Sequence, residues 1–174
     1  HGCTEALTLA LRAVAQPGDV VAVESPTYHG FLQVLDGLGL RALEIPTSPT
    51  QGLSVDALAF ALQQGAAGVA PDSIKAVLCM PSMHNPLGCS MPDTQKQRLV
   101  ALCHQHDVAL IEDDVYGDMG AGTGAIRPAK AFDLHGGVIH CGSLNKVLAP
   151  NLRVGWVVPG RWHRRVEMLH YTQT

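Results

Sequence analysis

The chain alternates between two kinds of segment, and this alternation constrains its fold more than any other feature. Apolar residues recur at helical spacing in four segments, which are residues 4–15, 28–39, 54–64 and 92–107. Short β-rich runs lie between or after them, at residues 20–25, 41–46, 74–81, 108–114 and 137–144. Strands that alternate with helices usually form a mostly parallel sheet with helices on both faces. We therefore predict a three-layer α/β/α domain.

One further strand is expected at residues 153–159, "RVGWVVP". Only "NKVLAPN" separates it from the strand at 137–144, and this connection is too short for a helical crossover between parallel strands. The last strand should therefore run antiparallel to its neighbour. A helix-like segment follows it at residues 161–174.

Composition excludes several classes of protein. Of the 174 residues 47% are hydrophobic and 16% are charged, which is typical of a globular domain. The formal net charge is -3, and the basic run "RWHRR" at 161–165 is interpreted as a charged helix face, so we expect no nucleic-acid contact by this segment. No apolar run is long enough for a membrane span, and no signal-like start is present.

The five cysteines are odd in number and show no CxxC spacing. They are expected to be reduced thiols in the core or at a pocket edge, in a cytoplasmic protein, and no zinc site is expected. The chain begins without Met inside one helix pattern and ends inside another. We therefore expect it to be a fragment of a larger protein.

Chemically useful side chains follow several of the predicted strands. In open parallel sheets, ligands bind beyond the carboxyl ends of the strands. The residues found there are Tyr28, Asn85, Asp113, Asp114, Tyr116, Ser143 and Lys146. Before the first helix, "HGCT" at 1–4 forms a glycine-containing turn whose backbone N–H groups can bind an anion. One edge of the sheet thus combines an anion site, an amide, two phenols, a carboxylate and a lysine.

Pyridoxal 5'-phosphate is a single ligand that needs all of these groups. The lysine would form a Schiff base with its aldehyde, and a buried carboxylate would keep its ring nitrogen protonated. A phenol and an amide would bond the ring hydroxyl, and an aromatic face would stack on the ring. The phosphate would take the helix N-terminus, Ser143 and Arg153, because arginine grips phosphate oxygens in a bidentate manner.

Four motifs in this order resemble the fold-type I, class I and II aminotransferases. They are "PTY" at 26–28, "NPLG" at 85–88, "EDDVYGD" at 112–118 and "SLNKVLAPNLRVGW" at 143–156. Two longer stretches, residues 24–47 and 110–118, look like the aminotransferase-like domain of MocR-type members of the GntR regulator family. The resemblance covers essentially the whole chain.

This resemblance implies a role for each matching residue. Lys146 would be the Schiff-base lysine, and Asp113 would partner the pyridine nitrogen. Asp113 is preferred to Asp114 because it stands three residues before Tyr116, as the family pattern requires. The ring oxygen would be bonded by Asn85 and Tyr116, and the ring would stack on Tyr28. The implied phosphate ligands are Gly2, Cys3, Thr4, Ser143 and Arg153.

Three positions depart from the family pattern. Asn145 stands where many relatives have Ser, Asn151 replaces the usual Gly, and His1 stands where a small residue is common. We expect Asn145 and His1 to alter phosphate binding. Taken singly, the site residues also have ordinary structural alternatives: Lys146 as a solvated strand-end cation, Asn85 as a turn former, Tyr28 as packing, and Arg153 in a surface ion pair.

The leading functional hypothesis is an aminotransferase-type domain that transfers an amino group between an amino acid and a 2-oxo acid through Lys146. The alternative is a domain that senses the cofactor or amino acids, in a MocR-type regulator with an upstream winged helix-turn-helix. A β-lyase or decarboxylase of the same fold is a third interpretation. In each case residues 1–174 would be part of the large cofactor-binding domain of a homodimer, without its N-terminal segment and small C-terminal domain.

Two motifs are not assigned to the site. "GAGTGA" at 120–125 resembles a dinucleotide glycine loop, but it does not open a helix directly after a strand, so we predict a surface loop. "HQHD" at 104–107 has metal-capable side chains and is expected to be a solvated helix end.

Overall fold

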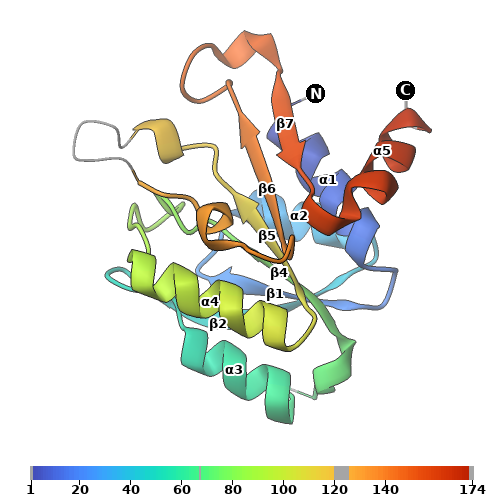
Figure 1. Cartoon of the computed structure of the whole chain (residues 1–174), viewed down its shortest axis with the longest axis vertical. Helices are drawn as coiled ribbons and strands as arrows, with labels where there is room; N and C mark the ends of the chain where they lie inside the picture. The colour runs from blue at the N-terminus through green and yellow to red at the C-terminus, as the bar shows by residue number, and fades with distance from the viewer. Residues whose placement is uncertain (1, 67, 120–125, 173–174) are drawn as a thin grey trace.

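The computed structural model describes residues 2–66, 68–119 and 126–172. Its centre is a seven-stranded sheet in the order β3-β2-β1-β4-β5-β6-β7 (Figure 1). The strands are β1 (Val20–Ser25), β2 (Arg41–Ser48), β3 (Gly52–Leu53), β4 (Ile74–Cys79), β5 (Ala109–Asp113), β6 (Val138–Ser143) and β7 (Gly155–Val158). The α-helices are α1 (Cys3–Val14), α2 (His29–Gly37), α3 (Val55–Gln64), α4 (Asp93–Gln105) and α5 (His163–Tyr171). Short 3₁₀ turns are η1 (Pro71–Ser73), η3 (Ala129–Phe132), η4 (Pro150–Leu152) and η5 (Gly160–Trp162).

The predicted fold class is confirmed. β2, β1, β4, β5 and β6 pair in parallel, and β7 pairs antiparallel with β6, as its short connection indicates. Each predicted strand and each of the four predicted α-helices begins and ends within two residues of the predicted positions. The sheet also contains β3, which pairs antiparallel with β2 and was not predicted. A strand of two residues is too short to show an alternating pattern.

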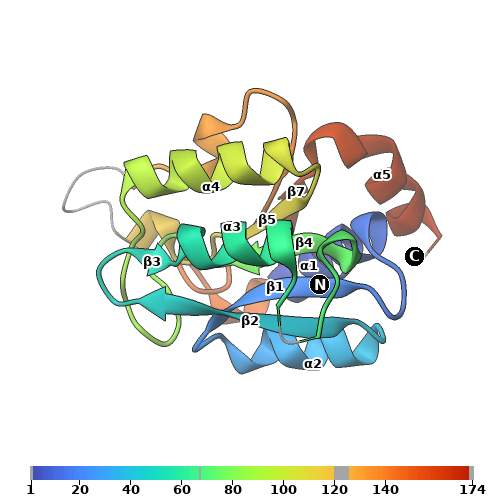
Figure 2. The ribbon, with the colours of Figure 1, turned by 90° about the horizontal axis from the view of Figure 1, so that it is seen from below.

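The two faces of the sheet are covered by different helices. Figure 2 shows α3 and α4 on one face and α2 on the other. Alternate residues of β1 point to opposite sides: Ala22 joins a buried cluster with Leu58 of α3 and Leu99 of α4, whereas Val23 joins a cluster with Leu11 of α1. Burial of one such leucine contributes roughly 1.5–3 kcal/mol, so both faces contribute to the stability of the fold.

The connections of the sheet create a natural ligand position. The chain leaves β1 for β2 on one side and later returns to β4 on the other side of β1, which makes a switch point between β1 and β4. Because β1, β4, β5 and β6 are parallel, their carboxyl ends lie along one edge. Ligands in open α/β sheets bind in the crevice at such an edge.

A close backbone contact brings the N-terminus of α1 to the same region. A Cβ on Gly155 of β7 would overlap the carbonyl group of Gly2, so only glycine allows the two backbones to approach this closely. α5 packs on the other side of α1, where Val166 is buried with Leu9 and Ala13. Within the described ranges, no helix is both long and apolar enough to cross a membrane.

Candidate functional site

A cavity of about 320 Å³ lies at the carboxyl edge of the parallel strands. This volume is within the range that is typical of small-molecule sites. Its lining includes every residue predicted for the site except Gly2, namely Cys3, Thr4, Tyr28, Asn85, Asp113, Tyr116, Ser143, Lys146 and Arg153. The remaining lining residues are Leu7, Met80, Val115, Asn145 and Pro150. Gly2 lines an adjacent cavity together with Arg153.

The alternation of side chains along β5 brings one carboxylate into this cavity. Asp113 points to the α1 side, together with Ile111, and is only 4% exposed. Glu112 points to the opposite face of the sheet, where it accepts a hydrogen bond from the Ala129 N–H. Asp114 does not line the cavity. The geometry therefore agrees with the preference for Asp113 over Asp114.

Two donors contact the Asp113 carboxylate. The backbone N–H of Val115 donates to its Oδ1 at 3.3 Å, and the Cys3 thiol donates to the same atom at 3.4 Å. Burial raises the pKa of Asp113 to about 7, although both hydrogen bonds act to lower it. Burial also raises the pKa of Cys3, so its thiol keeps the proton that it donates. A cationic N–H placed against Asp113 would stabilise the charged carboxylate.

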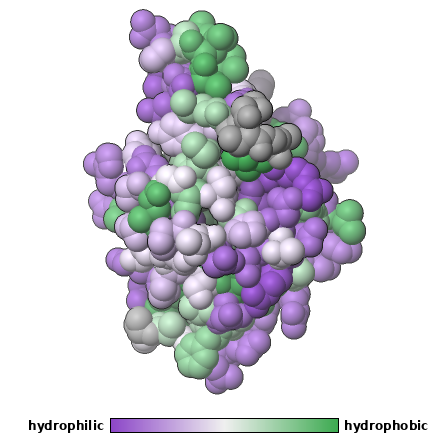
Figure 3. Space-filling view, turned by 90° about the vertical axis from the view of Figure 1, so that its left-hand side faces the viewer, coloured by the Kyte–Doolittle hydropathy of each residue, from purple (hydrophilic) through white to green (hydrophobic). Residues whose placement is uncertain are grey.

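The connection between β6 and β7 carries the two cations of the cavity, Lys146 and Arg153, and both side chains are exposed. Ser143 closes the base of this connection, because its hydroxyl donates to the Val154 carbonyl at 3.0 Å and accepts from the Asn145 N–H at 3.1 Å. The hydroxyl proton of Ser143 is thus directed along the loop. The connection also has exposed apolar residues, including Leu148, and Figure 3 shows a hydrophobic patch at this end of the molecule.

A second group of donors meets where α1 begins. Gly2 has φ 86°, and a Cβ on it would lie 3.2 Å from Asn145 Nδ2 and 3.8 Å from Arg153 Cζ. The N-cap residue of α1 is Gly2, and among the described residues no side-chain cap bonds the first turn. An amide, a guanidinium group and the backbone N–H groups of a helix N-terminus therefore converge, which is a favourable arrangement for an anion. The Oδ1 atom of Asn145 is buried and has no hydrogen-bond partner among the described residues.

Tyr28 directly precedes α2, and its side chain lines the cavity. Its ring packs edge-on against Phe31, with 5.6 Å between the ring centroids. Gly30 lies directly beneath it, since a Cβ there would overlap the Tyr28 ring. Sequence reasoning did not identify Gly30, because the direction of the Tyr28 ring is a rotamer choice that spacing does not reveal.

The apolar part of the lining was also not predicted. Met80 directly follows β4 and Val115 follows β5, and both face the α1 side. The alternation of these strands was a signal that could have identified them, because Leu78 and Ile111 precede them on the same face.

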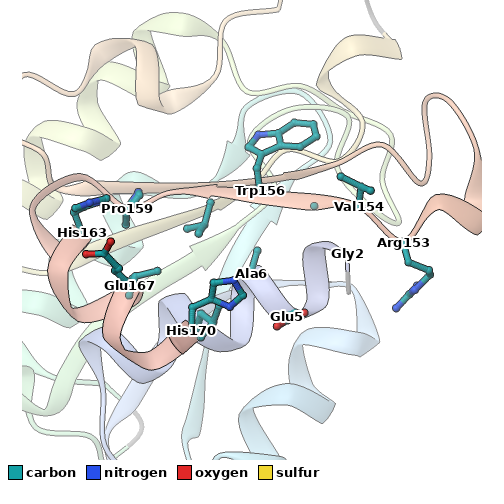
Figure 4. A pocket seen from close by; sticks show the side chains of 14 residues that line it. Gly2, Glu5, Ala6, Arg153, Val154, Trp156, Pro159, His163, Glu167 and His170 are labelled. Carbon is teal, nitrogen blue, oxygen red and sulfur yellow. The ribbon is translucent and has the colours of Figure 1, made fainter. Parts of the chain in front are cut away.

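A larger cavity, of about 430 Å³, lies between α1, β7 and α5. Figure 4 shows Arg153 beside Gly2 at one end of it and His163 with Glu167 at the other. Its lining contains neither Lys146 nor Asp113. We place the candidate site in the smaller cavity, because of the two only its lining includes both a buried carboxylate, Asp113, and a lysine, Lys146.

The "HQHD" motif at 104–107 contributes no residue to the lining of this cavity. At the end of α4, His104 stacks on His135 with 3.9 Å between ring centroids, and Asp107 pairs with Arg161 at 2.6 Å. No group of three or more metal-capable side chains is arranged for a metal ion in the part of the chain that the structure describes. The expected surface loop at 120–125 and the departure at His1 lie outside the described residues. All five cysteines are free thiols.

Known proteins with similar sequences and structures fall into two groups. The family model for aminotransferase class I and II matches residues 1–163. The chain is 44% identical over 170 residues to YjiR, an uncharacterized HTH-type transcriptional regulator of Escherichia coli (strain K12), covering 98% of this chain and 35% of that protein. It is 35% identical over 156 residues to aromatic-amino-acid aminotransferase 1 of Thermococcus litoralis, covering 90% of this chain and 37% of that enzyme.

Among solved structures, the kynurenine aminotransferase of Pyrococcus horikoshii, crystallised in complex with PMP, superposes with a TM-score of 0.85 at 32% identity. The match covers 98% of this chain and 42% of that one. The chain thus spans about a third of the length of its curated relatives. The resemblance inferred from the motifs is confirmed both for aminotransferases and for HTH-type regulators. On the matched family model, the shared fold and these relatives, the chain belongs to the aminotransferase class I and II family.

Proposed function

We propose that this chain binds pyridoxal 5'-phosphate in the 320 Å³ cavity and, within a longer protein, transfers an amino group between an amino acid and a 2-oxo acid. The observation that carries the proposal is a nearly buried carboxylate, Asp113, in a cavity that also contains the exposed amine of Lys146. A carboxylate whose pKa is raised to about 7 by burial is matched to a partner that brings an N–H and a positive charge.

The residues present fit the cofactor. Its phosphate fits the corner where Gly2, Asn145 and Arg153 converge on the start of α1. In this proposal the backbone N–H groups of Cys3 and Thr4 also face the phosphate, and Ser143 holds the loop closed behind it. The Asn145 amide then takes the place of the hydroxyl that many relatives have.

The opposite end of the cavity fits the ring. We assign Asp113 to the ring nitrogen, Asn85 and Tyr116 to the ring oxygen, and the face of Tyr28 to the ring itself. An aromatic face and two directed polar groups together determine the position and the rotation of a flat ring.

The cofactor, when bound, supplies an electron sink for the α-carbon of an amino acid. Asp113 would keep a proton on the ring nitrogen, because that cation would stabilise the charged carboxylate against its burial, which raises the pKa to about 7. Lys146 would provide the amine that holds the cofactor by its aldehyde, with loss of water, and the same amine would move a proton at the substrate α-carbon. Tyr28 and the apolar side chains Leu7, Met80 and Val115 exclude water from the ring.

We further propose that residues 1–174 form most of the large domain of a homodimeric protein, in which other segments contribute the remaining part of the substrate site. The chain spans 35% and 37% of two relatives, which leaves room for these segments.

A second function is favoured by the 44% identity to YjiR. The same cavity would then be the effector site of a transcriptional regulator, and a separate HTH domain would contact DNA. Both functions use the same cofactor contacts, so they differ in turnover rather than in binding.

The cofactor assignment is tested by absorption spectroscopy of the full-length protein. Lys146→Ala should abolish the visible band of the lysine-bound cofactor. Lys75→Ala is the matched control, because Lys75 is an exposed lysine that bonds the Asp72 carbonyl, outside the cavity. A visible band that is unchanged in Lys146→Ala would refute the assignment.

The two functions are separated by a half-reaction. Purified protein with bound cofactor is mixed with single amino acids, and release of the 2-oxo acid is measured over time. An aminotransferase converts the bound cofactor within seconds, since typical turnover numbers are on the order of 1–10³ per second. A sensor leaves most of the cofactor unconverted after many minutes. Loss of carbon dioxide would instead indicate a decarboxylase, and loss of the β-substituent would indicate a β-lyase.

A further inference from the structure

The loop that carries Asn85 runs from Met80 to Met91 and joins β4 to α4. Asn85 reaches the cavity from this loop, and a hydrogen bond from the Met91 N–H to the Pro81 carbonyl closes its base. Two charged side chains lie behind it, on the α3 and α4 side of the sheet. They are Glu24 of β1, which is 1% exposed, and Lys96 of α4, which is 0% exposed. Neither of them lines the cavity.

Glu24 holds the beginning of the loop. Its Oε2 atom accepts a hydrogen bond from the Met80 N–H at 2.8 Å and lies 3.1 Å from Nε2 of His84. Nδ1 of His84 accepts from the Leu87 N–H at 3.3 Å. A neutral imidazole that accepts at Nδ1 carries its proton on Nε2, so the N–H side of the ring lies against the Glu24 carboxylate. His84 is itself 2% exposed and directly precedes Asn85.

Lys96 holds the same loop from the helix. Its ammonium group donates to the Ser82 hydroxyl at 3.0 Å and to the Arg127 carbonyl at 2.6 Å. Ser82 is 1% exposed. The two charged residues thus contact every second residue of the loop, at positions 80, 82 and 84. The next residue, Asn85, lines the cavity.

Buried charges of this kind are weak contributors to stability. Taking each ion out of water costs several kcal/mol, and apolar residues of similar size often do as well or better. Their contacts are directional, however: Glu24 accepts from the Met80 N–H, and Lys96 donates to the Ser82 hydroxyl and the Arg127 carbonyl. Buried hydrogen bonds of this kind restrict the groups that they join to few arrangements. The arrangement held here is that of the segment before Asn85.

We propose that Glu24 and Lys96 are positioning residues that orient Asn85 toward the cofactor ring oxygen from the opposite face of the sheet. This inference rests on the proposed function for the role of Asn85. The two charged residues act only through the loop, since neither lines the cavity.

The first test measures the loop without cofactor, by amide hydrogen exchange of the cofactor-free full-length protein. Glu24→Gln replaces a charged acceptor with a neutral one, and Lys96→Met removes the ammonium donor. Both should accelerate exchange in residues 80–91 by about tenfold or more, because hydrogen bonds to charged groups are the stronger ones. Glu112→Gln is the matched control: it is an equally buried carboxylate that holds the Ala129 and Lys130 N–H groups instead. Its effect should be confined to residues 127–133.

His84→Gln is measured in the same way, because it removes the imidazole from the loop without altering the sheet. It should accelerate exchange in residues 80–91 even if a Glu24 variant fails to fold. Unchanged exchange of the loop in His84→Gln and Lys96→Met, with the rest of the sheet protected, would overturn the proposal.

The second test asks whether the effect passes through Asn85. The pH midpoint of the visible cofactor band is measured for wild type, Asn85→Ala, Glu24→Gln and the double variant. Glu24→Gln should shift the midpoint in the same direction as Asn85→Ala, and the double variant should shift no further than Asn85→Ala alone. Additive shifts would overturn the proposal, because Glu24 would then act by another route.

The outcomes separate the inference from the proposed function. If Asn85→Ala leaves the midpoint unchanged, the proposed role of Asn85 fails, and the role of Glu24 toward the ring oxygen fails with it. If Asn85→Ala shifts the midpoint and Glu24→Gln does not, only the positioning role is refuted. Glu112→Gln is the control in this measurement too. If it shifts the pH midpoint as much as Glu24→Gln does, the positioning role is also refuted, since Glu112→Gln leaves the loop contacts intact.

Discussion

Asp113→Asn should stabilise the cofactor-free protein at neutral and alkaline pH while it removes the proposed partner of the ring nitrogen. Burial raises the pKa of Asp113 to about 7, whereas an aspartate in an unfolded chain has a pKa near 3.8. The folded chain therefore binds this proton more tightly than the unfolded chain does. The free energy of unfolding then decreases as the pH rises from 4 to 7.

The size of this effect follows from the same two values. A difference between a pKa of about 7 and one of 3.8 corresponds to about 4 kcal/mol, at ~1.36 kcal/mol for each pH unit. Asparagine has the same shape and can still accept from the Val115 N–H, but it carries no charge. The stability of Asp113→Asn relative to wild type should therefore increase by about 4 kcal/mol between pH 4 and pH 8.

The measurement is urea-dependent hydrogen exchange of the β5 and β6 segments in cofactor-free protein, at several pH values. Asp133→Asn is an internal control of opposite sign. Although burial acts to raise it, the pKa of Asp133 is lowered to about 2 by the Lys130 ammonium and the N–H groups of Val138, Gly137 and His135. Its stabilising contribution is present above pH 4 and is lost as the pH falls toward 2. A stability difference for Asp113→Asn that does not vary with pH would refute the reasoning.

Two further substitutions test the other walls of the cavity. Gly30→Ala should displace the Tyr28 ring and weaken cofactor affinity, with little change in the free energy of unfolding. Gly37→Ala in the same helix is the control, because its Cβ meets no atom within 4 Å and should leave the affinity unchanged. Equal affinities in the two variants would contradict the stacking role of Tyr28. Arg153→Lys keeps the charge but loses the bidentate grip, so the cofactor dissociation constant, measured by fluorescence titration, should rise about tenfold. Wild-type affinity in Arg153→Lys would place the phosphate elsewhere.

Much of this structure could be predicted because two periodicities are visible in the sequence. Alternation of helical and strand patterns gave the order of the layers, and the short connection after β6 indicated that β7 is antiparallel. The site residues then followed from topology, since parallel strands end at one edge. Asp113 and Lys146 are far apart in sequence, yet both line one cavity because β5 and β6 are parallel neighbours.

Other features depend on contacts that no periodicity reveals. The ring of Tyr28 over Gly30 and the closure of the Lys146 loop by Ser143 are set by side-chain rotamers. Lys96 is a different case, because the sequence contained a signal for its burial. It lies three, four and seven residues before Leu99, Val100 and Cys103, which are the positions that share the buried face of α4.

The sequence "EDD" at the end of β5 shows how one strand can serve both sides of the sheet. Its alternation sends Asp113 toward the cavity and Glu112 to the opposite face, where Glu112 contacts His140 and holds the segment that begins at Ala129. β1 has the same division, since Val23 faces the α1 side and Glu24 holds the loop that carries Asn85. In β5 one face contributes to the cavity, and in both strands the charged residue on the opposite face holds a connecting segment in place. A one-residue shift in register would exchange these roles, so the position of the site depends directly on the register of the parallel sheet.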